Sequence, residues 1–293
     1  MFDVAIVGGS FAGLSAALPL ARARRRVVVF DTGMRRNRFA SASHGFLAQD
    51  GRAPEDIVAD GRAQLATYPT FERIEGAVAA ITGTQGAFAL QAGDTTHRAR
   101  RIILAMGVAD ALPPIPGLAQ RWGRTVFHCP YCHGYELQQG RIGVIATSAL
   151  SLHQAQLLPE WGRVTFFLNG ALTLGDDDAG LLAARGVVVE AVPVARIVDE
   201  ARVVLADGRS DSFAGLFTAS RTSPASPLAA QLGCEHEEGP MGTFVRTDAM
   251  KATSVPGVFA CGDLARAAGN VPLAVGDGAL AGTAAHASLV FQR

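Results

Sequence analysis

The sequence predicts an α/β protein in which a Rossmann-like strand–helix–strand unit occurs twice. In the first unit, an apolar run at residues 3–7 ends in a glycine-rich turn, an Ala/Leu-rich helical pattern follows, and residues 27–30 form a second apolar run. The same order of strand, turn, helix and strand returns over residues 141–168. Strand patterns that alternate with helical ones are typical of parallel sheets covered by helices. The 293 residues, 49% of them hydrophobic, are enough for two such domains.

The turn of the first unit carries an incomplete dinucleotide-binding pattern. Gly8, Gly9 and Gly13 are in place. Ser10 replaces the middle glycine, and Asp31 ends the second strand. Glycines let the backbone approach a pyrophosphate, a helix N-terminus favours its negative charge, and an acid at this spacing can hold ribose hydroxyls. Because serine is small, the pattern indicates a weakened dinucleotide site; the alternative is a glycine turn in some other strand–helix–strand unit.

The rest of the chain predicts further strands, surface helices and one connector. Residues 35–55 are polar and irregular, and residues 54–68 have the pattern of an amphipathic helix. The proline-rich segment 113–117 is a stiff connector and a plausible domain boundary. Residues 220–242 are polar. Short strands are expected at residues 76–83, 87–92, 98–104, 186–192, 196–198 and 203–205, with helices at residues 150–161 and from about residue 277.

Composition excludes several classes of function. The formal net charge is zero, so there is no electrostatic case for binding nucleic acid or a membrane surface. No apolar run reaches the ~18 residues of a membrane span. Met1 leads straight into a strand-like run without the basic region of a signal peptide, so we expect a cytoplasmic protein. In that reducing compartment a Cys-x-x-Cys pair is more often catalytic than structural.

Such a pair lies near the middle of the chain. Cys129 and Cys132 are two residues apart, with His128 and His133 on either side. A Cys-x-x-Cys pair can switch between dithiol and disulfide, and a nearby imidazolium or helix N-terminus acidifies one thiol. Zinc is an alternative, but zinc sites usually draw a second ligand pair from further along the chain. The two remaining cysteines, Cys234 and Cys261, stand alone, so a redox pair is favoured and no metal is expected.

Three further stretches give this pair a context: Gly8–Gly13 with Asp31, residues 105–107, and the run Gly257–Asp263. Together they resemble the flavoprotein disulfide reductases that have two dinucleotide-binding domains. A Cys-x-x-Cys placed just before the second unit resembles the low-molecular-weight thioredoxin reductases. The segments Cys-Pro-Tyr-Cys-His-Gly-Tyr-Glu and Ser-His-Gly-Phe-Leu are similar to those of the thioredoxin-reductase-like dithiol oxidases. Those enzymes close disulfides in small natural products such as gliotoxin and holomycin.

The resemblance implies a domain organisation and a cofactor. It implies two Rossmann-like (FAD/NAD(P)-binding) three-layer domains, the second inserted in the first. Residues 1–115 and 243–293 would form the FAD-binding domain, and residues 116–242 an NADPH-domain-like domain that carries the Cys-x-x-Cys. In the implied FAD site, Gly8, Gly9 and Gly13 face the pyrophosphate, Asp31 the ribose, Asp263 the ribityl chain or a nearby phosphate, and Asn270 and Val271 the isoalloxazine. The other implied FAD-binding residues are Ser10, Arg36, Asn37, His44, Gly107 and Gly262. Asn270 is a departure, since glutamine is usual there.

The second unit departs from the reductases, in which it binds NADPH. Ala146, Ser148 and Ser151 occupy the positions of the turn glycines, where their side chains would crowd a pyrophosphate. The segment Leu168-Asn169-Gly170 replaces a His-Arg-Arg that holds the 2′-phosphate, and three aspartates at residues 176–178 would repel it. We therefore expect NADPH binding to be lost or weak. The alternative is that this domain binds NAD(P)H in an unconventional way.

The resemblance also implies a mechanism. A substrate thiolate would attack Cys129, and a second substrate thiol would release the new disulfide. Cys132 would face the flavin and pass electrons through FAD to oxygen, giving hydrogen peroxide. His133 follows Cys132 directly, where thioredoxin reductases carry an aspartate acid/base. A histidine with a pKa near 6.5 suits that work at neutral pH, and His128 is a second candidate.

Two other functions stay open. One is a thioredoxin reductase-like disulfide reductase, which uses NADPH or another electron donor and acts on thioredoxin or a small disulfide. The other is a non-catalytic flavin redox sensor. In each case a small dithiol or disulfide, or a thioredoxin-like protein, is the expected partner, and the family implies a homodimer.

Overall fold

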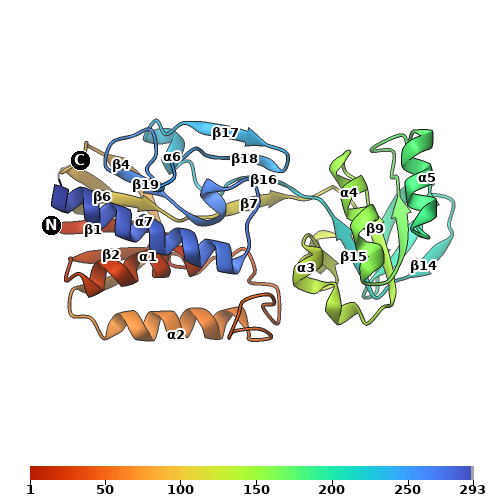
Figure 1. Ribbon diagram of the computed structural model, residues 1–293, viewed down its shortest axis with the longest axis horizontal. Coiled ribbons are helices and arrows are strands. Elements are labelled where there is room, and N and C mark those ends of the chain that lie inside the picture. Colours follow the sequence, from red (N-terminus) through yellow and green to blue (C-terminus); the bar gives the residue numbers. More distant parts are fainter. Residues whose placement is uncertain (292–293) are drawn as a thin grey trace.

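The computed structural model describes residues 1–291 and shows two lobes joined by a narrow waist (Figure 1). The first lobe holds the first strand and the last helix of the described residues, and the second lobe contains the middle of the sequence. The structure therefore contains two separate strand–helix–strand units within one chain, which confirms the predicted fold class of paired Rossmann-like domains.

The first lobe is built on a seven-stranded sheet. Its core is parallel, with β1 paired to β2 and β6, and the crossover from β1 to β2 passes through a helix. The members of this sheet are β1 (Phe2–Val7), β2 (Val27–Asp31), β3 (Phe71–Glu75), β4 (Val78–Thr82), β5 (Phe88–Ala92), β6 (Thr95–Leu104) and β19 (Val258–Ala260). Helices α1 (Phe11–Arg22), α2 (Pro54–Ala66) and α7 (Val271–Phe291) lie along one side of it (Figure 1).

The second lobe repeats this plan on a smaller scale. Its sheet has the strand order β11-β10-β9-β15-β8, and all four pairings are parallel. The members are β8 (Val126–Phe127), β9 (Arg141–Ile145), β10 (Arg163–Phe167), β11 (Val188–Glu190) and β15 (Gly215–Thr218). The accompanying helices are α3 (Pro130–His133), α4 (Leu150–Leu157) and α5 (Asp176–Ala184), with short 3-10 turns η1 (Ala119–Arg121), η2 (Tyr135–Leu137) and η3 (Leu158–Glu160). An antiparallel sheet of β12 (Val194–Val198), β13 (Arg202–Leu205) and β14 (Ser210–Ser212) completes the lobe.

Two strands form the waist. Strand β7 (Val108–Ala111) leaves the first lobe, and β16 (Arg221–Pro224) returns to it, pairing antiparallel with β7. They continue a four-stranded sheet with β17 (His236–Gly239) and β18 (Gly242–Val245). Both crossings of the chain between the lobes therefore lie in one hydrogen-bonded pair of strands.

Residues 221–242, which we expected in the inserted domain, pack against the first lobe. Leu228 and Ala229 in α6 (Leu228–Gln231), and Cys234 after it, are buried in the same core as Phe88 and Val245 of the first lobe. Their shared core joins residues 221–242 to the first lobe, because a domain is a unit with its own buried core. We propose that the inserted domain ends near residue 220.

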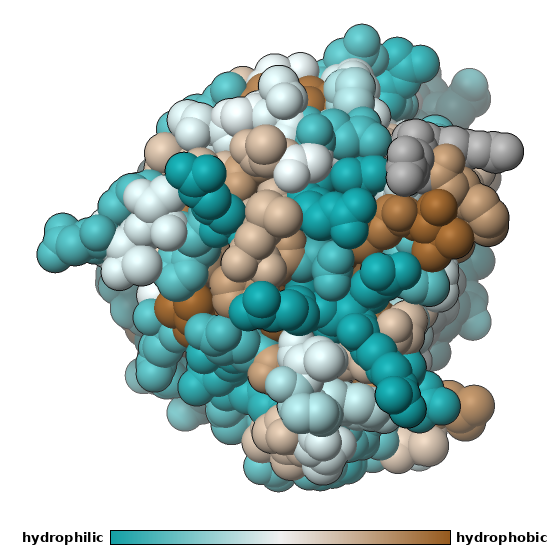
Figure 2. All heavy atoms as spheres, turned by 90° about the vertical axis from the view of Figure 1, so that its left-hand side faces the viewer, coloured by the Kyte–Doolittle hydropathy of each residue, from teal (hydrophilic) through white to brown (hydrophobic). Residues whose placement is uncertain are grey.

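The C-terminal helix begins earlier than the sequence suggested. We expected a start near Asp277, whereas α7 begins at Val271. Pro272 and Gly276 lowered the helical signal of this segment, but proline is tolerated in the first turn, where its missing N–H has no helical partner. Within residues 1–291 no helix combines the length and apolar character needed to cross a membrane. The end of the first lobe that points away from the second is mainly hydrophilic, with small separate apolar areas (Figure 2).

Candidate redox-active site

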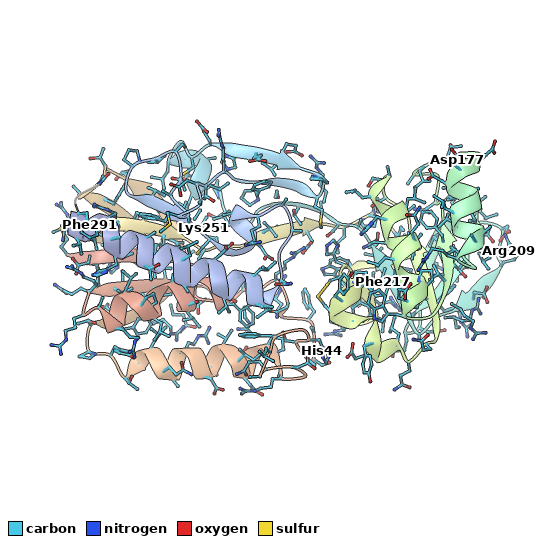
Figure 3. All side chains as sticks on the ribbon, in the orientation of Figure 1. His44, Asp177, Arg209, Phe217, Lys251 and Phe291 are labelled. Atoms are coloured by element: carbon cyan, nitrogen blue, oxygen red, sulfur yellow. A yellow bond between two sulfur atoms is a disulfide. The ribbon has the colours of Figure 1, made fainter. Side chains whose placement is uncertain are left out.

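Cys129 and Cys132 form a disulfide, with their Cα atoms 5.3 Å apart. Cys129 precedes the short helix α3, whose first residue is Pro130, and the amide of Cys132 donates to the carbonyl of Cys129 at 3.3 Å. Proline at this position fixes a helical φ and sacrifices no helical hydrogen bond, so the tight turn that closes the ring is preformed. Figure 3 shows the disulfide at the edge of the second lobe that faces the first.

His133 stacks on Phe127, with ring centroids 4.3 Å apart and an interplanar angle of 21°. Burial lowers the pKa of His133 to about 4, against the opposing effect of the Glu136 carboxylate. The expected pKa near 6.5 therefore does not hold, because the ring loses hydration in this environment. At neutral pH the imidazole is unprotonated, so it can accept a proton from a thiol.

His128 lies on the other side of the disulfide. Its carbonyl accepts a hydrogen bond from Nε2 of Gln154 at 2.8 Å. Its ring Nδ1 is buried and has no hydrogen-bond partner among residues 1–291. Burial, followed by the positive charge of Arg36, lowers the pKa of His128. The His128 ring is therefore also neutral at pH 7. It can accept a proton or simply fill space, but it does not supply the positive charge of an imidazolium.

His44 reaches the redox segment from the first lobe (Figure 3). Its Nε2 lies 3.5 Å from Oε1 of Glu136, and its Nδ1 lies 3.6 Å from Oδ1 of Asp50. Glu136 follows the Cys-x-x-Cys by four residues, so the loop that holds His44 contacts the second lobe next to the disulfide. The structure thus brings together His44 and the redox segment, which are far apart in the sequence.

The glycine turn between β1 and α1 has the shape of a pyrophosphate cradle. A Cβ on Gly13 would lie 1.7 Å from the carbonyl oxygen of Gly8, and a Cβ on Gly8 would lie 2.3 Å from that of Ala105. A Cβ on Gly9 would lie 2.5 Å from the side chain of Asp31. Ser10 occupies the N-cap of α1 without a side-chain capping bond, and no acid lies in the first turn. The amides of this helix end remain available to an anion, so these residues fit FAD.

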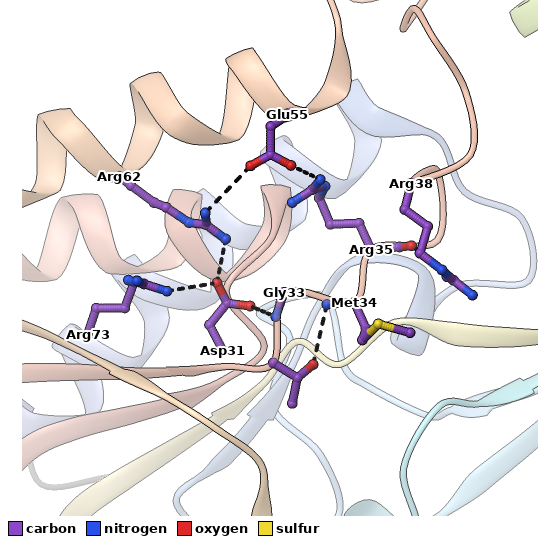
Figure 4. A network of polar contacts seen from close by, with 9 residues as sticks. Asp31, Gly33, Met34, Arg35, Arg38, Glu55, Arg62 and Arg73 are labelled. Atoms are coloured by element: carbon purple, nitrogen blue, oxygen red, sulfur yellow. Dashed lines mark hydrogen bonds and ion pairs between the residues drawn. The ribbon is translucent and has the colours of Figure 1, made fainter.

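The carboxylate of Asp31 already has several hydrogen-bond and ion-pair partners within the protein (Figure 4). Its side chain is buried at the end of β2, and its Oδ1 accepts the amide of Gly33 at 2.8 Å. Its Oδ2 lies 2.7 Å from Arg62 and 3.6 Å from Arg73. Glu55 links Arg62 to Arg35 in the same network. A ribose would have to share this carboxylate with the arginines, which no sequence pattern had singled out.

The remaining predicted flavin residues lie on the segments around this turn. Asp263 lies in η4 (Gly262–Ala265), where Gly262 has a φ of +70° and its absent side chain leaves room for Ala12. Asn270 accepts the amide of Leu273 at 2.9 Å, so it caps α7. This capping role explains an asparagine in place of glutamine. Asn37 accepts the amide of Ala40 through its backbone, Gly107 has a φ of +70°, and Val271 begins α7.

Within the site, Arg36 binds two different carboxylates. It donates to both carboxylate oxygens of Asp110 at 2.9 and 2.7 Å and to Asp263 at 2.9 Å. Ser220 donates to Asp110 at 2.6 Å. Sequence reasoning missed Asp110 and Ser220, because they contact each other across 110 residues and belong to no recognised motif.

In the turn of the second unit, serine hydroxyl groups accept backbone amides. Ser151 is fully buried, and its Oγ accepts the amide of Thr147 at 3.0 Å. Ser148 accepts the amide of Leu150 at 3.3 Å. These are amides that a pyrophosphate would need. Asn169 accepts the amide of Val194 at 3.0 Å, and Arg221 pairs with Glu238.

A cavity of about 480 Å³ remains beside this turn. Its wall has one cationic side chain, Arg221, and is otherwise formed by small polar and apolar residues around Ala146 and Ala219. A nicotinamide dinucleotide phosphate needs close backbone approach and cations for its 2′-phosphate, so the described residues do not fit NADPH.

The cysteines outside the pair have structural environments. Cys261 is fully buried, and burial raises the pKa of its thiol to about 12. Burial also raises the pKa of Cys234. Over residues 1–291, no group of three or more His, Cys, Asp or Glu side chains is arranged to hold a metal ion.

The chain is similar to known proteins over nearly its whole length. Residues 2–278 match the family described as pyridine nucleotide-disulphide oxidoreductase. The relative "Thioredoxin reductase tcpT" of Claviceps purpurea is 34% identical over 98% of this chain and 94% of its own. "Thioredoxin reductase sirT" of Leptosphaeria maculans is 32% identical over 97% and 93%.

Solved structures agree with these matches. An oxidoreductase from Agrobacterium tumefaciens is 56% identical, with a TM-score of 0.98 over 100% of this chain and 99% of that one. The structure named HlmI is 38% identical, with a TM-score of 0.91 over 99% and 93%. The similarity covers both lobes and the redox segment.

Proposed function

The chain belongs to the pyridine nucleotide-disulphide oxidoreductase family, and we propose that within it the protein is an FAD-dependent dithiol oxidase with oxygen as electron acceptor. Its match to proteins named thioredoxin reductase makes it a thioredoxin reductase-like disulfide oxidoreductase, and the family implies FAD.

The observation that carries the oxidase direction of electron flow is the contrast between the two nucleotide turns. The turn at Gly8–Gly13 keeps its glycines and leaves its helix amides available. In the second turn, Ser148 and Ser151 accept the amides that a nucleotide would need. If NADPH does not supply electrons, the substrate thiols must supply them, and the pair Cys129–Cys132 is the group that can receive them.

The disulfide supports thiol–disulfide exchange as the first half of the reaction, and by family resemblance Cys129 is the sulfur that is attacked. A substrate thiolate attacks Sγ of Cys129, the Cys129–Cys132 bond breaks, and Cys132 leaves as a thiolate. The second substrate thiolate then attacks the substrate sulfur of the mixed disulfide and releases Cys129 as a thiolate. The substrate is oxidised by two electrons, and the cysteine pair is reduced by two. His133 follows Cys132 in the chain and its ring is neutral at pH 7, which supports it as the acceptor of a proton released from a thiol.

FAD, when bound, would supply the acceptor through which these two electrons reach oxygen, giving hydrogen peroxide and restoring the disulfide. The residues that would hold it are the glycines at positions 8, 9 and 13, Asp31, Asp263 and the start of α7. We further propose a small dithiol as substrate, a homodimer as the assembly and the cytoplasm as the location.

A reductase is the second candidate. The names of the fungal relatives favour it, and the cavity of about 480 Å³ beside the second turn leaves space there, although its lining lacks the usual nucleotide contacts. In that case NADPH would enter without the usual turn contacts, and electrons would flow from it to Cys129–Cys132 and on to a disulfide substrate.

Steady-state turnover of the FAD-loaded protein tests the oxidase. With dithiothreitol in air and no nicotinamide, we expect one hydrogen peroxide for each oxidised dithiothreitol. Cys129→Ser and Cys132→Ser should each reduce this rate to background, whereas Cys234→Ser, which changes a buried thiol in the core, should retain it. Peroxide release that depends on NADPH, or that survives both substitutions, would contradict the proposal.

A further inference from the structure

A partly buried group of charged and polar side chains lies where the two lobes meet. We call it the waist cluster, and its members are Arg36, Asp110, His128, Ser220 and Asp263. They come from the loop after β2, from β7, from the end of β8, from the residue before β16 and from η4. Five segments that are distant in sequence therefore meet at the waist.

Asp110 is the centre of this cluster. Arg36 binds its two carboxylate oxygens with Nε and Nη2, at 2.9 and 2.7 Å, in a bidentate pair. The third guanidinium nitrogen of Arg36 binds Asp263 at 2.9 Å. Planar bidentate pairs of this kind fix orientation as well as distance.

Burial makes this pair costly to break from one side. The Asp110 side chain is 8% exposed, and that of Arg36 is 26% exposed. Burial by itself would raise the pKa of Asp110, but the hydrogen bond and charge of Arg36 hold it below its usual range. Removal of one partner would leave an unbalanced charge in a poorly solvated place.

The position of Asp110 links this pair to the angle between the lobes. Asp110 pairs with Thr222 across the two strands of the waist, and its carboxylate also accepts the hydroxyl of Ser220. Both crossings of the chain are thereby tied to Arg36 of the first lobe. On the other side, His128 is close enough for its pKa to respond to both Arg36 and Asp110, and Cys129 follows it directly.

We propose that Asp110 is a positioning residue: through Arg36 and Ser220 it fixes the waist so that the disulfide of the second lobe faces the first lobe. The hydrogen-bond partners of Asp110 are Arg36 and Ser220, so its proposed effect on the reacting sulfur atoms is indirect. It acts through the strands that carry the second lobe and through the segment that contains His128. The catalytic part of this inference rests on the proposed function, whereas the structural part does not.

The test uses the FAD-loaded Asp110→Asn protein, in which the side chain keeps its shape and loses its charge. Hydrogen–deuterium exchange, read by mass spectrometry, reports the waist independently of activity. We expect exchange in β7, β16 and residues 126–137 to rise by about tenfold or more, with β1 and β6 unchanged. Stopped-flow reduction of the flavin by dithiothreitol without air should slow by about tenfold or more, because small misplacements of reacting groups are costly.

Two further measurements separate positioning from other losses. The rate at which dithiothreitol reduces the disulfide of the FAD-free protein, followed by counting thiols, should change less than about twofold, since the disulfide itself is untouched. FAD content should also stay at the wild-type level. Asp110→Glu, which keeps the charge, should recover a large part of the flavin reduction rate.

Asp277→Asn is the matched control. Asp277 is another buried aspartate, paired with Lys251 at 2.9 Å and Arg266 at 2.5 Å inside the first lobe. This variant should lose stability without changing exchange at the waist or the flavin reduction rate. Wild-type exchange at the waist in Asp110→Asn, or the same local change in Asp277→Asn, would overturn the inference.

Two further results decide the inference if Asp110→Asn does not fold or if dithiothreitol does not reduce the flavin. If Asp110→Asn does not fold, Ser220→Ala removes only the hydroxyl bond and should raise exchange in β7 and β16 to a smaller degree; no change there would overturn the inference. If dithiothreitol never reduces the wild-type flavin, the proposed oxidase function fails, and the exchange data still decide whether Asp110 fixes the waist.

Discussion

We propose His133 as a base, and its surroundings set its basicity. Its ring stacks on Phe127, and burial lowers its pKa to about 4. A neutral imidazole next to Cys132 can take a proton from a thiol at neutral pH without prior deprotonation. The same burial makes it a weak acid–base partner at pH 7, so its contribution depends mainly on placement.

The first prediction concerns activity. His133→Gln keeps a polar side chain of similar size but cannot act as a base. We expect dithiothreitol oxidation, measured by peroxide release at about pH 7.5, to fall by about 10². His128→Gln is the comparison, because His128 is the second candidate for the base. A larger loss of dithiothreitol oxidation in His128→Gln than in His133→Gln would make His128 the base.

The second prediction concerns the pH dependence of stability. Burial lowers the folded-state pKa of His133 to about 4, whereas an unfolded histidine titrates near about 6.5. Between these values the unfolded chain binds the proton and the folded chain does not. The stabilising contribution of the neutral ring is therefore fully present above the unfolded pKa and is lost as the pH falls toward about 4.

Chemical denaturation measures this effect. Between about pH 7.5 and about pH 5, the free energy of unfolding should fall by about 1 to 2 kcal/mol more in the wild type than in His133→Gln. His128 is unchanged in both proteins, so its own titration cancels. Equal falls in the two proteins would mean that His133 does not titrate as the structure indicates.

At the scale of elements, the contact between α1 and the first strand depends on missing side chains. A Cβ at position 13 would lie 1.7 Å from the carbonyl oxygen of Gly8, which belongs to the backbone and cannot rotate away. The start of α1 can approach β1 only with glycine at this position. The same approach places the helix amides at the carboxyl end of the strand, where a pyrophosphate would bind.

The third prediction follows from this contact. Gly13→Ala should displace the start of α1, and we expect the purified protein to lose most of its FAD, measured by the ratio of absorbance near 450 nm to that at 280 nm. Gly180→Ala is the control: Gly180 lies in α5, and a Cβ there meets nothing within 4 Å. Alanine should leave FAD content unchanged and stabilise the helix by up to about 1 kcal/mol. Full FAD retention in Gly13→Ala would contradict the proposal that this turn holds the pyrophosphate of FAD.

Individual elements could be predicted where their signal was local. The strand–turn–helix unit at the N-terminus was predictable because apolar period, glycines and the terminal acid lie within one short segment. The start of α7 was misplaced, since Pro272 and Gly276 weaken the helical pattern although the packing against α1 tolerates them. The partners of Asp31 were missed, because Arg62 and Arg73 reach it from α2 and β3.

At the scale of the whole molecule, the prediction from sequence was right about the two units and less informative about how they join. The pair formed by Arg36 and Asp110 connects positions 74 residues apart, and no periodicity reveals such a contact. The polar segment 221–242 was read as part of the inserted domain, whereas Leu228 and Cys234 are buried with the first lobe. Tertiary contacts decide both features, and a local pattern does not contain them.

The central claim is that electrons enter through the dithiol and not through a nicotinamide. The most direct test is an anaerobic visible spectrum of the FAD-loaded protein during additions of NADPH, then NADH, then dithiothreitol, followed by air. We expect no bleaching of the flavin by either nicotinamide, bleaching by dithiothreitol, and return of the colour with release of peroxide in air. Rapid bleaching by micromolar NADPH would contradict it, because the turn closed by Ser148 and Ser151 would then bind the nucleotide after all.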